Sequence, residues 1–258
     1  MMHNGFQDLI NAIEKLTGKT FPKVDKENID LAKMRREEAH LASLEIAEKR
    51  RKNHKHEINE MYLQSIINPN WTFDKIQIDS LNSKAVEIAK SFCSLLKIPD
   101  NYIADTNPAL LLIQGSPGCG KTVLCNCVAN KFLNEHYKEV QICTFNAIKR
   151  ARAPGYKDTA YDAEEKISSW EKYLHTDLLI IDGLCQDNEN LTAFDKQVFV
   201  ELLRTRKKLG LPIVITTTMP IANISTNIGE ACIESIKDYS VFASALLGLS
   251  RRQAIVFN

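Results

Sequence analysis

The chain has 258 residues, of which 25% are charged and 44% hydrophobic, and its formal net charge is +1. This is the composition of an ordinary globular protein, long enough for one large domain or for one medium domain with an appendage. The low net charge excludes a global field that would draw the chain onto nucleic acid or membrane, so any basic site is local. No apolar run approaches the roughly 20 residues that cross a bilayer, and the N-terminus lacks the pattern of a secretion signal. We therefore expect a cytoplasmic protein with no membrane partner.

Residues 1–68 are expected to form a helical region outside the main core. Residues 6–16 carry apolar side chains at helical spacing, which predicts a short amphipathic helix. Residues 25–58 are highly charged, contain neither Pro nor Gly, and predict one long solvated helix or two shorter ones. Within them, the basic run at 49–56 is either a solvated helical face or a contact for phosphate or for a partner. The turn residues Asn68-Pro69-Asn70 mark the end of this region.

Residues 69–258 show alternating strand-like and helix-like segments, which predict an α/β fold with a parallel sheet flanked by helices. Short apolar runs predict strands at 110–114, 140–145, 178–182, 212–218 and 254–257. Helical periodicity predicts helices near 83–96, 120–135, 159–174, 193–209 and 226–237. The seven cysteines are odd in number and include no C-x-x-C pair, so we expect reduced, structural thiols.

The most informative stretch is 115–122, which matches the pattern G-x-x-x-x-G-K-[ST] at every fixed position. It lies between a predicted strand and a predicted helix, the context that a phosphate-binding P-loop requires. Glycines let backbone N–H groups surround a phosphate, and the following helix directs its positive dipole end toward it. We expect Lys121 to reach the β- and γ-phosphates of ATP and the Thr122 hydroxyl to hold Mg²⁺. The predicted ATP-binding residues are Gly115, Ser116, Pro117, Gly118, Cys119, Gly120, Lys121 and Thr122.

A second nucleotide element is the apolar strand 178–181 followed by Asp182, which is typical of a Walker B motif. The strand would deliver the carboxylate to the sheet edge beside the P-loop, where it would hold Mg²⁺ together with Thr122. Gly183 follows, and a glycine supplies no general base for the attacking water. Asp187 and Glu189 are either substitutes for that base or ordinary loop acids. The hypothesis is that the chain binds ATP and Mg²⁺ but hydrolyses ATP slowly by itself.

The order and spacing of these segments resemble a known group of proteins. The segment Trp71-Thr72-Phe73, the P-loop, the run 177–182, the helix 198–208 and the strand 211–217 follow one another as in the DnaC/IstB-like AAA+ ATPases. Ile228-Gly229-Glu230 and a closing 255–258 complete the resemblance, which covers about residues 70–258. Within this group the chain is most similar to the DnaC-type loaders of the bacterial replicative helicase.

The resemblance implies a function and partners. It implies that residues 1–68 grip the hexameric replicative helicase, while residues 69–258 form an AAA+ core that binds ATP and single-stranded DNA. It further implies self-association through that core, with ATP between neighbouring subunits. The expected function is loading of the helicase onto single-stranded DNA. Two alternatives stay open: an IstB-like transposition helper ATPase, and a nucleotide-gated adaptor or inhibitor of the helicase that does not cycle.

Three departures from the family pattern bear on hydrolysis. Gly183 replaces the second Walker B acid, and Thr217 falls on or near the sensor position, which is commonly Asn. The residues that supply inter-subunit arginines are missing, because Ala231 and Ser235 occupy that motif. Arginine fingers contribute orders of magnitude to turnover, so their loss also predicts slow hydrolysis. Arg251-Arg252 are either replacements or surface arginines. The expected catalytic residues are Lys121, Thr122, Asp182 and Thr217.

The segment 146–157 combines basic residues, an aromatic residue and a Pro-Gly turn. Loaders of this group place a DNA-facing helical element here, and such a surface suits backbone contacts with base stacking. The alternative is a solvated loop after a short helix. The candidate DNA-binding residues are Lys149, Arg150, Arg152 and Tyr156.

Overall fold

The computed structural model describes residues 15–16, 18, 31–63, 66–95, 107–136, 139–153, 160–185, 190–220, 223–248 and 250–251. The chain divides into two compact units, Met1–Asn53 and His54–Asn258. The predicted division between residues 68 and 69 stays a prediction. Several expectations fall on residues outside the described ranges, namely the helix at 6–16 except for Lys15 and Leu16, the strand at 254–257, and the residues Tyr156, Asp187, Glu189 and Arg252.

Helix α2 (Leu31–Leu63) is one continuous helix of 33 residues. From Lys33 to Asn53 every residue is exposed, as its charged sequence requires. In the second unit the last turns carry apolar residues, and Ile58 is buried in the same core cluster as Leu124, Val128 and Phe132. The predicted long solvated helix is therefore confirmed within the described residues, and the helix continues five residues beyond the predicted end at residue 58.

The second unit is built around a parallel sheet. Among the described residues, five strands pair in the order β2-β3-β4-β1-β5, and every pairing is parallel. The strands are β1 (Ala109–Gly115), β2 (Val140–Cys143), β3 (Leu178–Leu184), β4 (Ile213–Thr217) and β5 (Ser240–Leu246). Because all strands run the same way, their carboxyl ends meet at one edge, where ligands of open α/β sheets bind.

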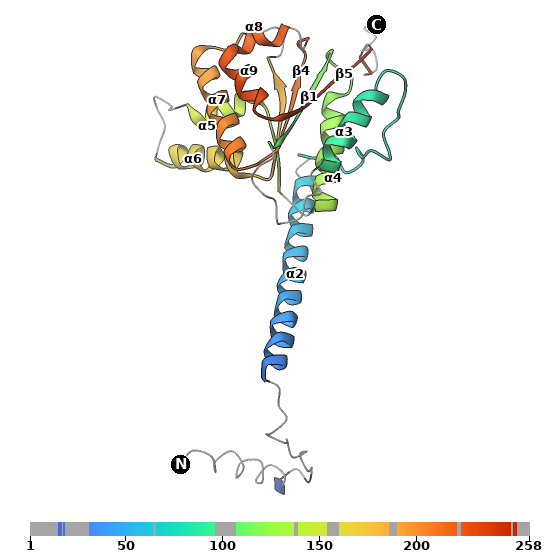
Figure 1. Cartoon of the computed structure of the whole chain (residues 1–258), viewed down its shortest axis with the longest axis vertical. Coiled ribbons are helices and arrows are strands. Elements are labelled where there is room, and N and C mark those ends of the chain that lie inside the picture. The colour runs from blue at the N-terminus through green and yellow to red at the C-terminus, as the bar shows by residue number, and fades with distance from the viewer. Residues whose placement is uncertain are drawn as a thin grey trace. The chain divides into compact units, whose positions relative to one another are not determined.

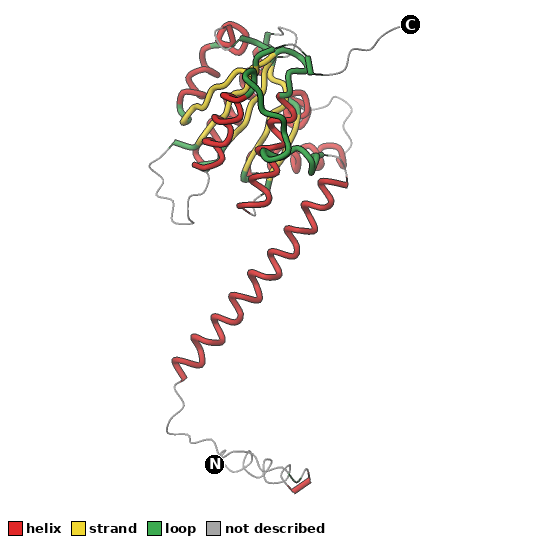
Figure 2. The backbone as a smooth tube through the Cα atoms, turned by 90° about the vertical axis from the view of Figure 1, so that its right-hand side faces the viewer, coloured by secondary structure: helices red, strands yellow, loops and turns green. Residues whose placement is uncertain are grey.

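Helices cover both faces of this sheet (Figures 1 and 2). Neighbouring residues of a strand point to opposite faces, so Leu111 and Ile113 join the core cluster under α3 and α4, whereas Leu110 and Leu112 join the cluster under the other helices. The helices are α3 (Ser83–Leu95), α4 (Lys121–His136), α5 (Phe145–Arg152), α6 (Ala160–His175), α7 (Ala193–Lys208), α8 (Ile224–Ile228) and α9 (Glu230–Lys237). The predicted α/β class, with a parallel sheet flanked by helices, is confirmed.

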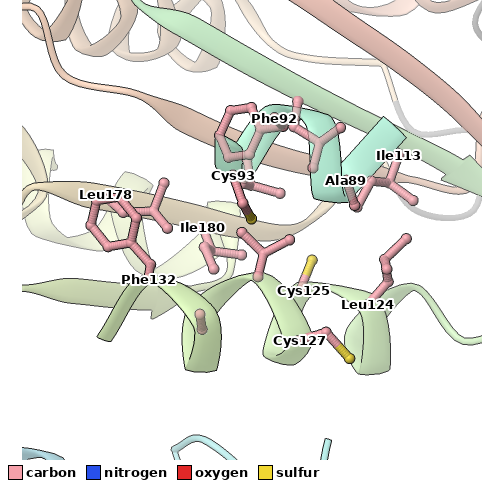
Figure 3. Packing of buried hydrophobic residues seen from close by; sticks show 14 of the residues in the cluster. Ala89, Phe92, Cys93, Ile113, Leu124, Cys125, Cys127, Phe132, Leu178 and Ile180 are labelled. Atoms are coloured by element: carbon pink, nitrogen blue, oxygen red, sulfur yellow. The ribbon is translucent and has the colours of Figure 1, made fainter. Parts of the chain in front are cut away.

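The cluster between α3 and α4 contains several thiols (Figure 3). Cys93, Cys125 and Cys127 are buried there beside Phe92 and Phe132. All seven cysteines of the chain are free. Burial raises the pKa of the Cys93 thiol to about 12, so this thiol stays protonated at neutral pH. The expectation of reduced thiols that pack as small apolar side chains is confirmed for these three.

One sheet element differs from expectation. Strand β5 (Ser240–Leu246) lies at the sheet edge beside β1, and it is not among the strands predicted from the sequence. Ser240, Val241 and Ala243 of this strand are exposed, and its sequence includes two serines. It therefore lacks the continuous apolar run that identified the inner strands. Within the described part of the chain, no helix combines the length and the apolar character that crossing a membrane requires.

Candidate nucleotide-binding site

The P-loop connects the carboxyl end of β1 to the first turn of α4, as predicted. Gly118 and Gly120 have φ angles of 80° and 109°, a region that residues with a Cβ rarely adopt. A side chain at Gly118 would also collide with Ser250. The glycines are therefore needed for the loop's shape, in which backbone N–H groups can surround an anion.

Lys121 is held by the loop itself. Its Nζ donates hydrogen bonds to the backbone carbonyls of Gly115 and Ser116, at 2.8 and 2.9 Å. These bonds fix the ammonium group at the phosphate-binding loop. The cation is therefore in place for a phosphate ligand before any ligand binds, at the N-terminus of α4, where the helix dipole also favours an anion.

Asp182 lies beside Thr122 at the carboxyl edge of the sheet. Thr122 Oγ1 donates to Asp182 Oδ2 at 2.7 Å, and Thr216 Oγ1 donates to Asp182 Oδ1 at 2.6 Å. The two residues predicted to hold Mg²⁺ are thus in direct contact. Thr216 was missed, because a threonine in the strand run 212–218 carries no local signal that separates it from its neighbours.

A pocket of about 720 Å³ adjoins these groups. Among the described residues, its basic lining comes from Lys75, Lys121 and Arg251, and its acidic lining comes from Asp182. Apolar or aromatic side chains make a second part of the wall, and they include Trp71, Ile76, Val86, Val123, Leu124 and Leu246. This volume is in the range of pockets that hold cofactors, and the lining combines a cationic loop with an apolar region.

The lining fits a nucleotide with Mg²⁺. The cationic loop suits phosphates, and the apolar wall suits a base. Among the described residues, no group of three or more His, Cys, Asp or Glu side chains could hold a metal by itself. A Mg²⁺ ion would therefore take its remaining ligands from phosphate oxygens and water, with Thr122 and Asp182 as the protein side, which is how proteins usually bind this ion.

Two asparagines of α4 hold the 66–71 segment against the site. Asn126 Oδ1 accepts the backbone N–H of Asn68 at 2.8 Å, and Asn126 Nδ2 donates to the carbonyl of Thr122 at 2.8 Å. Asn130 Nδ2 donates to the carbonyls of Asn68 and Trp71, both at 2.9 Å, while its Oδ1 accepts the Tyr62 hydroxyl at 2.8 Å. Both asparagines are buried. They fix Trp71, which lines the pocket.

The residues that follow β5 pass over the P-loop. Leu247, Gly248, Ser250 and Arg251 are called the strap below. Ser116 Oγ donates to the Gly248 carbonyl at 2.9 Å, and the Arg251 backbone N–H donates to the Gly118 carbonyl at 3.0 Å. The Arg251 guanidinium pairs with Asp79, with an Nη2–Oδ2 distance of 2.9 Å. Arg251 therefore lines the pocket of its own chain.

The other candidate residues for hydrolysis lie as follows. Thr217 is fully buried, and its hydroxyl accepts the Met219 backbone N–H at 3.1 Å, whereas Thr218 lines the pocket. Ala231 is exposed in the first turn of α9. Ser235 is buried and donates to the Ala231 carbonyl at 2.9 Å. No charged side chain stands at either of the two positions of the expected arginines.

The predicted DNA-binding residues lie on α5, apart from Tyr156, which is outside the described residues. Lys149 pairs with Asp195 at 3.5 Å, and Arg152 pairs with Glu201 at 3.1 Å. Arg150 is exposed, and its Nε donates to the Asn146 carbonyl at 3.5 Å. Two of the three cations are therefore partly neutralised within the chain.

The strand order β2-β3-β4-β1-β5, with the P-loop directly after β1 and Asp182 near the carboxyl end of β3, agrees with the predicted AAA+ fold. The match to the DnaC helicase loader in its crystal structure has a TM-score of 0.52 with 17% identity, covering 67% of this chain and 96% of that chain. The AMPPCP-bound DnaA from Aquifex aeolicus matches with a TM-score of 0.52 and 16% identity, covering 70% of this chain and 51% of that chain. At these identities the likeness concerns the fold.

Sequence comparison gives two further similarities. The family described as Nephrocystin 3, N-terminal, matches residues 100–203, a span that includes the P-loop and Asp182. The chromosomal replication initiator protein DnaA of Helicobacter acinonychis (strain Sheeba) is 29% identical over 139 residues, which are 54% of this chain and 28% of that protein. The chain thus spans little more than a quarter of the length of this curated relative.

Proposed function

We propose that the chain is an ATP-binding protein of DNA replication that loads the replicative helicase onto single-stranded DNA in the cytoplasm and hydrolyses ATP slowly by itself. The observation that carries the proposal is the contact between Thr122 and Asp182 beside the Lys121-bearing loop, in a pocket of about 720 Å³. The likeness in fold to a helicase loader and to a nucleotide-bound replication initiator supports the same function.

In this proposal the residues divide the work as follows. Lys121 and the N–H groups of 115–122 neutralise the β- and γ-phosphates of ATP, and Thr122 and Asp182 hold Mg²⁺. When bound, the nucleotide supplies the phosphate charges that these groups recognise. Trp71 and Ile76 provide the apolar surface for the base. Thr217 stays a predicted sensor residue. Its neighbour Thr218, which directly follows β4, lines the pocket.

Slow hydrolysis is supported by the residue after Asp182. Gly183 has a φ of 98°, so the backbone there suits glycine and offers no position for a catalytic carboxylate. Ala231 and Ser235 supply no arginine to a neighbouring subunit. These observations also favour a second candidate, a nucleotide-gated adaptor of the helicase that does not cycle.

A direct test is equilibrium binding of a fluorescent ATP analogue in the presence of Mg²⁺. Wild type is expected to bind, whereas Lys121→Ala loses about 10-fold or more in affinity, because charge-assisted hydrogen bonds contribute about 1.5–3 kcal/mol each. Lys131→Ala is a matched control on the same helix, since Lys131 pairs with Glu135 away from the pocket. Equal affinity of the wild type and Lys121→Ala would contradict ATP binding at this site.

Partner binding needs a separate experiment. The helicase contact is assigned to residues 1–68, and a pull-down of the full chain with the host's replicative helicase, with and without ATP, tests it. Capture of the helicase is expected. Capture of a transposase instead would favour the IstB-like alternative, and single-turnover hydrolysis with helicase and single-stranded DNA separates a loader from a non-cycling adaptor.

The proposed contact with single-stranded DNA is made by Lys149, Arg150, Arg152 and Tyr156. Binding to an oligonucleotide over a salt series is expected to weaken and to lose salt dependence when the three basic residues are replaced by Ala. Arg150→Ala alone is expected to account for most of the change, because Lys149 and Arg152 already pair with carboxylates of the same chain. An unchanged salt slope in the triple variant would refute this DNA contact.

A further inference from the structure

Strand β3 contains an irregularity at the two residues that follow its apolar run. Ile181 pairs with Ile215 and Leu184 with Thr217, so β3 uses three residue steps where β4 uses two. The extra residue of β3 lies in the segment Asp182-Gly183, between the two paired positions. Such a bulge redirects a side chain and leaves a backbone group without its ladder partner.

The side chain of Thr216 meets that need. The Gly183 backbone N–H donates to Thr216 Oγ1 at 2.8 Å. A hydroxyl has one proton, and here that proton is directed to Asp182 Oδ1, at 2.6 Å. Thr216 is fully buried, so no water competes for these two bonds. One threonine therefore ties the bulged backbone of β3 to the carboxylate that the bulge redirects.

The Asp182 carboxylate is held at both oxygens by threonines from different elements. Thr216 of β4 takes Oδ1, and Thr122 of α4 takes Oδ2. Since Oδ1 is engaged with a buried side chain, Oδ2 is the oxygen directed toward Thr122. Rotation of the carboxylate would break the Thr216 bond, which fixes the orientation of Oδ2.

We propose that Thr216 is a positioning residue for the metal: its hydroxyl orients Asp182 so that Oδ2 and the Thr122 hydroxyl together form the protein side of a Mg²⁺ site. This inference rests on the proposed function. Partners that orient a metal-binding group typically change metal affinity by about 10- to 100-fold when they are removed. Thr216 is fully buried and does not line the pocket, so we expect its effect to be confined to steps that need Mg²⁺.

The test is a Mg²⁺ titration of fluorescent ATP-analogue binding, together with binding in EDTA, for the full chain and for Thr216→Val, which keeps the side-chain shape. Thr216→Val is expected to need about 10-fold more Mg²⁺ for half-maximal binding, with unchanged binding in EDTA. Thr216→Ser is expected to restore the wild-type titration, because it keeps the hydroxyl. Thr176→Val is the matched control, since Thr176 is also buried but donates to the Glu139 carbonyl at 3.4 Å.

The outcomes separate the inference from the proposed function. An unchanged Mg²⁺ midpoint in Thr216→Val overturns the inference, and so does a loss of binding that is equally large in EDTA, which indicates a purely structural role. If Thr216→Val does not fold, Thr216→Cys replaces it in the same titration. Because a thiol is a weaker hydrogen-bond donor than a hydroxyl, Thr216→Cys is expected to raise the Mg²⁺ midpoint by a smaller factor than Thr216→Val. A Mg²⁺ midpoint of Thr216→Cys equal to that of the wild type overturns the inference. A wild type that binds ATP equally with and without Mg²⁺ overturns the inference and the Mg²⁺ site of the proposed function but leaves ATP binding intact. A wild type that binds no ATP overturns the proposed function as a whole.

Discussion

Thr122 and Asp182 are 60 residues apart in the sequence, and a hydrogen bond of 2.7 Å joins their side chains. Thr122 stands in the first turn of α4, and Asp182 near the end of β3. Parallel strands bring the loops after them to one sheet edge, which is why two motifs predicted separately from the sequence meet in space. The contact places the two metal-holding candidates together.

The first prediction concerns the glycine after Asp182. With φ at 98°, Gly183 occupies a region that costs other residues roughly 1–2 kcal/mol. Gly183→Ala is expected to lower the free energy of unfolding by about that amount, and Gly183→Asn by less, because asparagine tolerates this region better. Urea denaturation of the three proteins measures both changes. Equal losses for alanine and asparagine would contradict the backbone explanation.

The same backbone limits any attempt to restore hydrolysis. Gly183→Glu would add the acid that the sequence lacks, yet on a backbone that does not suit it. We expect ATP turnover of Gly183→Glu to stay at the wild-type level, measured as phosphate release with Mg²⁺. A large gain in turnover would show that a carboxylate at this position reaches the attacking water.

The second prediction concerns a buried cation beside the residues that directly precede β3 and β4. Arg206 has no exposed surface, and its guanidinium donates to the carbonyls of Tyr173, Leu174, Thr176, Asp177 and Pro212 at 2.9–3.5 Å. It joins the end of α6 to the starts of β3 and β4. Burial lowers the pKa of Arg206 to about 10, so the side chain stays charged at neutral pH.

Removal of this guanidinium leaves several buried carbonyls without donors, at about 1–3 kcal/mol each. Arg206→Met is therefore expected to lower the free energy of unfolding by about 3 kcal/mol or more. Arg204→Met is the matched control, because Arg204 is exposed on the same helix and should change stability by less than about 0.5 kcal/mol. Similar denaturation midpoints for the two variants would refute the structural role of Arg206.

The third prediction concerns the asparagines of α4. Asn130→Ala removes the bonds to Tyr62, Asn68 and Trp71, whereas Asn134 donates only to the Asn130 carbonyl of its own helix in the described contacts. Asn130→Ala is expected to weaken ATP-analogue binding several-fold, roughly as expected from 1–2 kcal/mol, because Trp71 is no longer fixed at the pocket wall. Asn134→Ala should bind as wild type does. Identical affinities would show that the 66–71 segment plays no part in nucleotide binding.

The fourth prediction concerns the strap. The hydrogen bond from Arg251 holds the pKa of the Asp79 carboxyl below its ordinary value, and the backbone N–H groups of Leu81 and Asn82 act in the same direction. A carboxyl with a lowered folded-state pKa stabilises the fold above its unfolded pKa, and this contribution is lost as the pH falls through the folded pKa. The pairing that holds the strap is therefore expected to weaken only in strong acid.

Carboxyl-carbon NMR titration checks this pairing. In Arg251→Ala the pKa of Asp79 is expected to rise toward its ordinary value, because the largest cause of the lowered pKa has been removed. Lys75→Ala is a suitable control, since Lys75 is near in sequence but donates to Asn70. An Asp79 pKa that does not change in Arg251→Ala would mean that the two side chains are not paired in solution.

Features with strong local patterns could be predicted from the sequence. The inner strands were predicted because they are continuously apolar, and the P-loop because its glycines and Lys121 stand at fixed spacing. Strand β5 was not predicted, because it begins with Ser240, Ser244 interrupts its apolar residues, and several of its residues at the sheet edge are exposed. Helix α5, which contains Lys149 and Arg150, was expected only from the family resemblance and not from its own periodicity. The different environments of these two residues depend on residues of α7, which no local pattern reveals.

The contacts that shape the site were harder to predict, because they join distant parts of the chain. Thr216 and Thr217 are neighbouring residues of the same type. Only the alternation of side chains between the two faces of the sheet decides which of their hydroxyls faces Asp182. From the sequence, Arg251 was either a replacement for the missing inter-subunit arginine or a surface arginine. Its pairing with Asp79 and its backbone bond to Gly118 place it beside the P-loop of its own chain. Such pairings follow from the return of β5 beside β1.

In the proposed function, the chain binds Mg²⁺ and ATP as a switch and hydrolyses the nucleotide slowly by itself. The most direct measurement incubates the purified chain with ATP and Mg²⁺, separates the protein from free nucleotide, and identifies the bound nucleotide by chromatography over time. We expect the bound nucleotide to remain mostly ATP over many minutes without helicase or DNA. Rapid conversion of the bound ATP to ADP by the chain alone would contradict it.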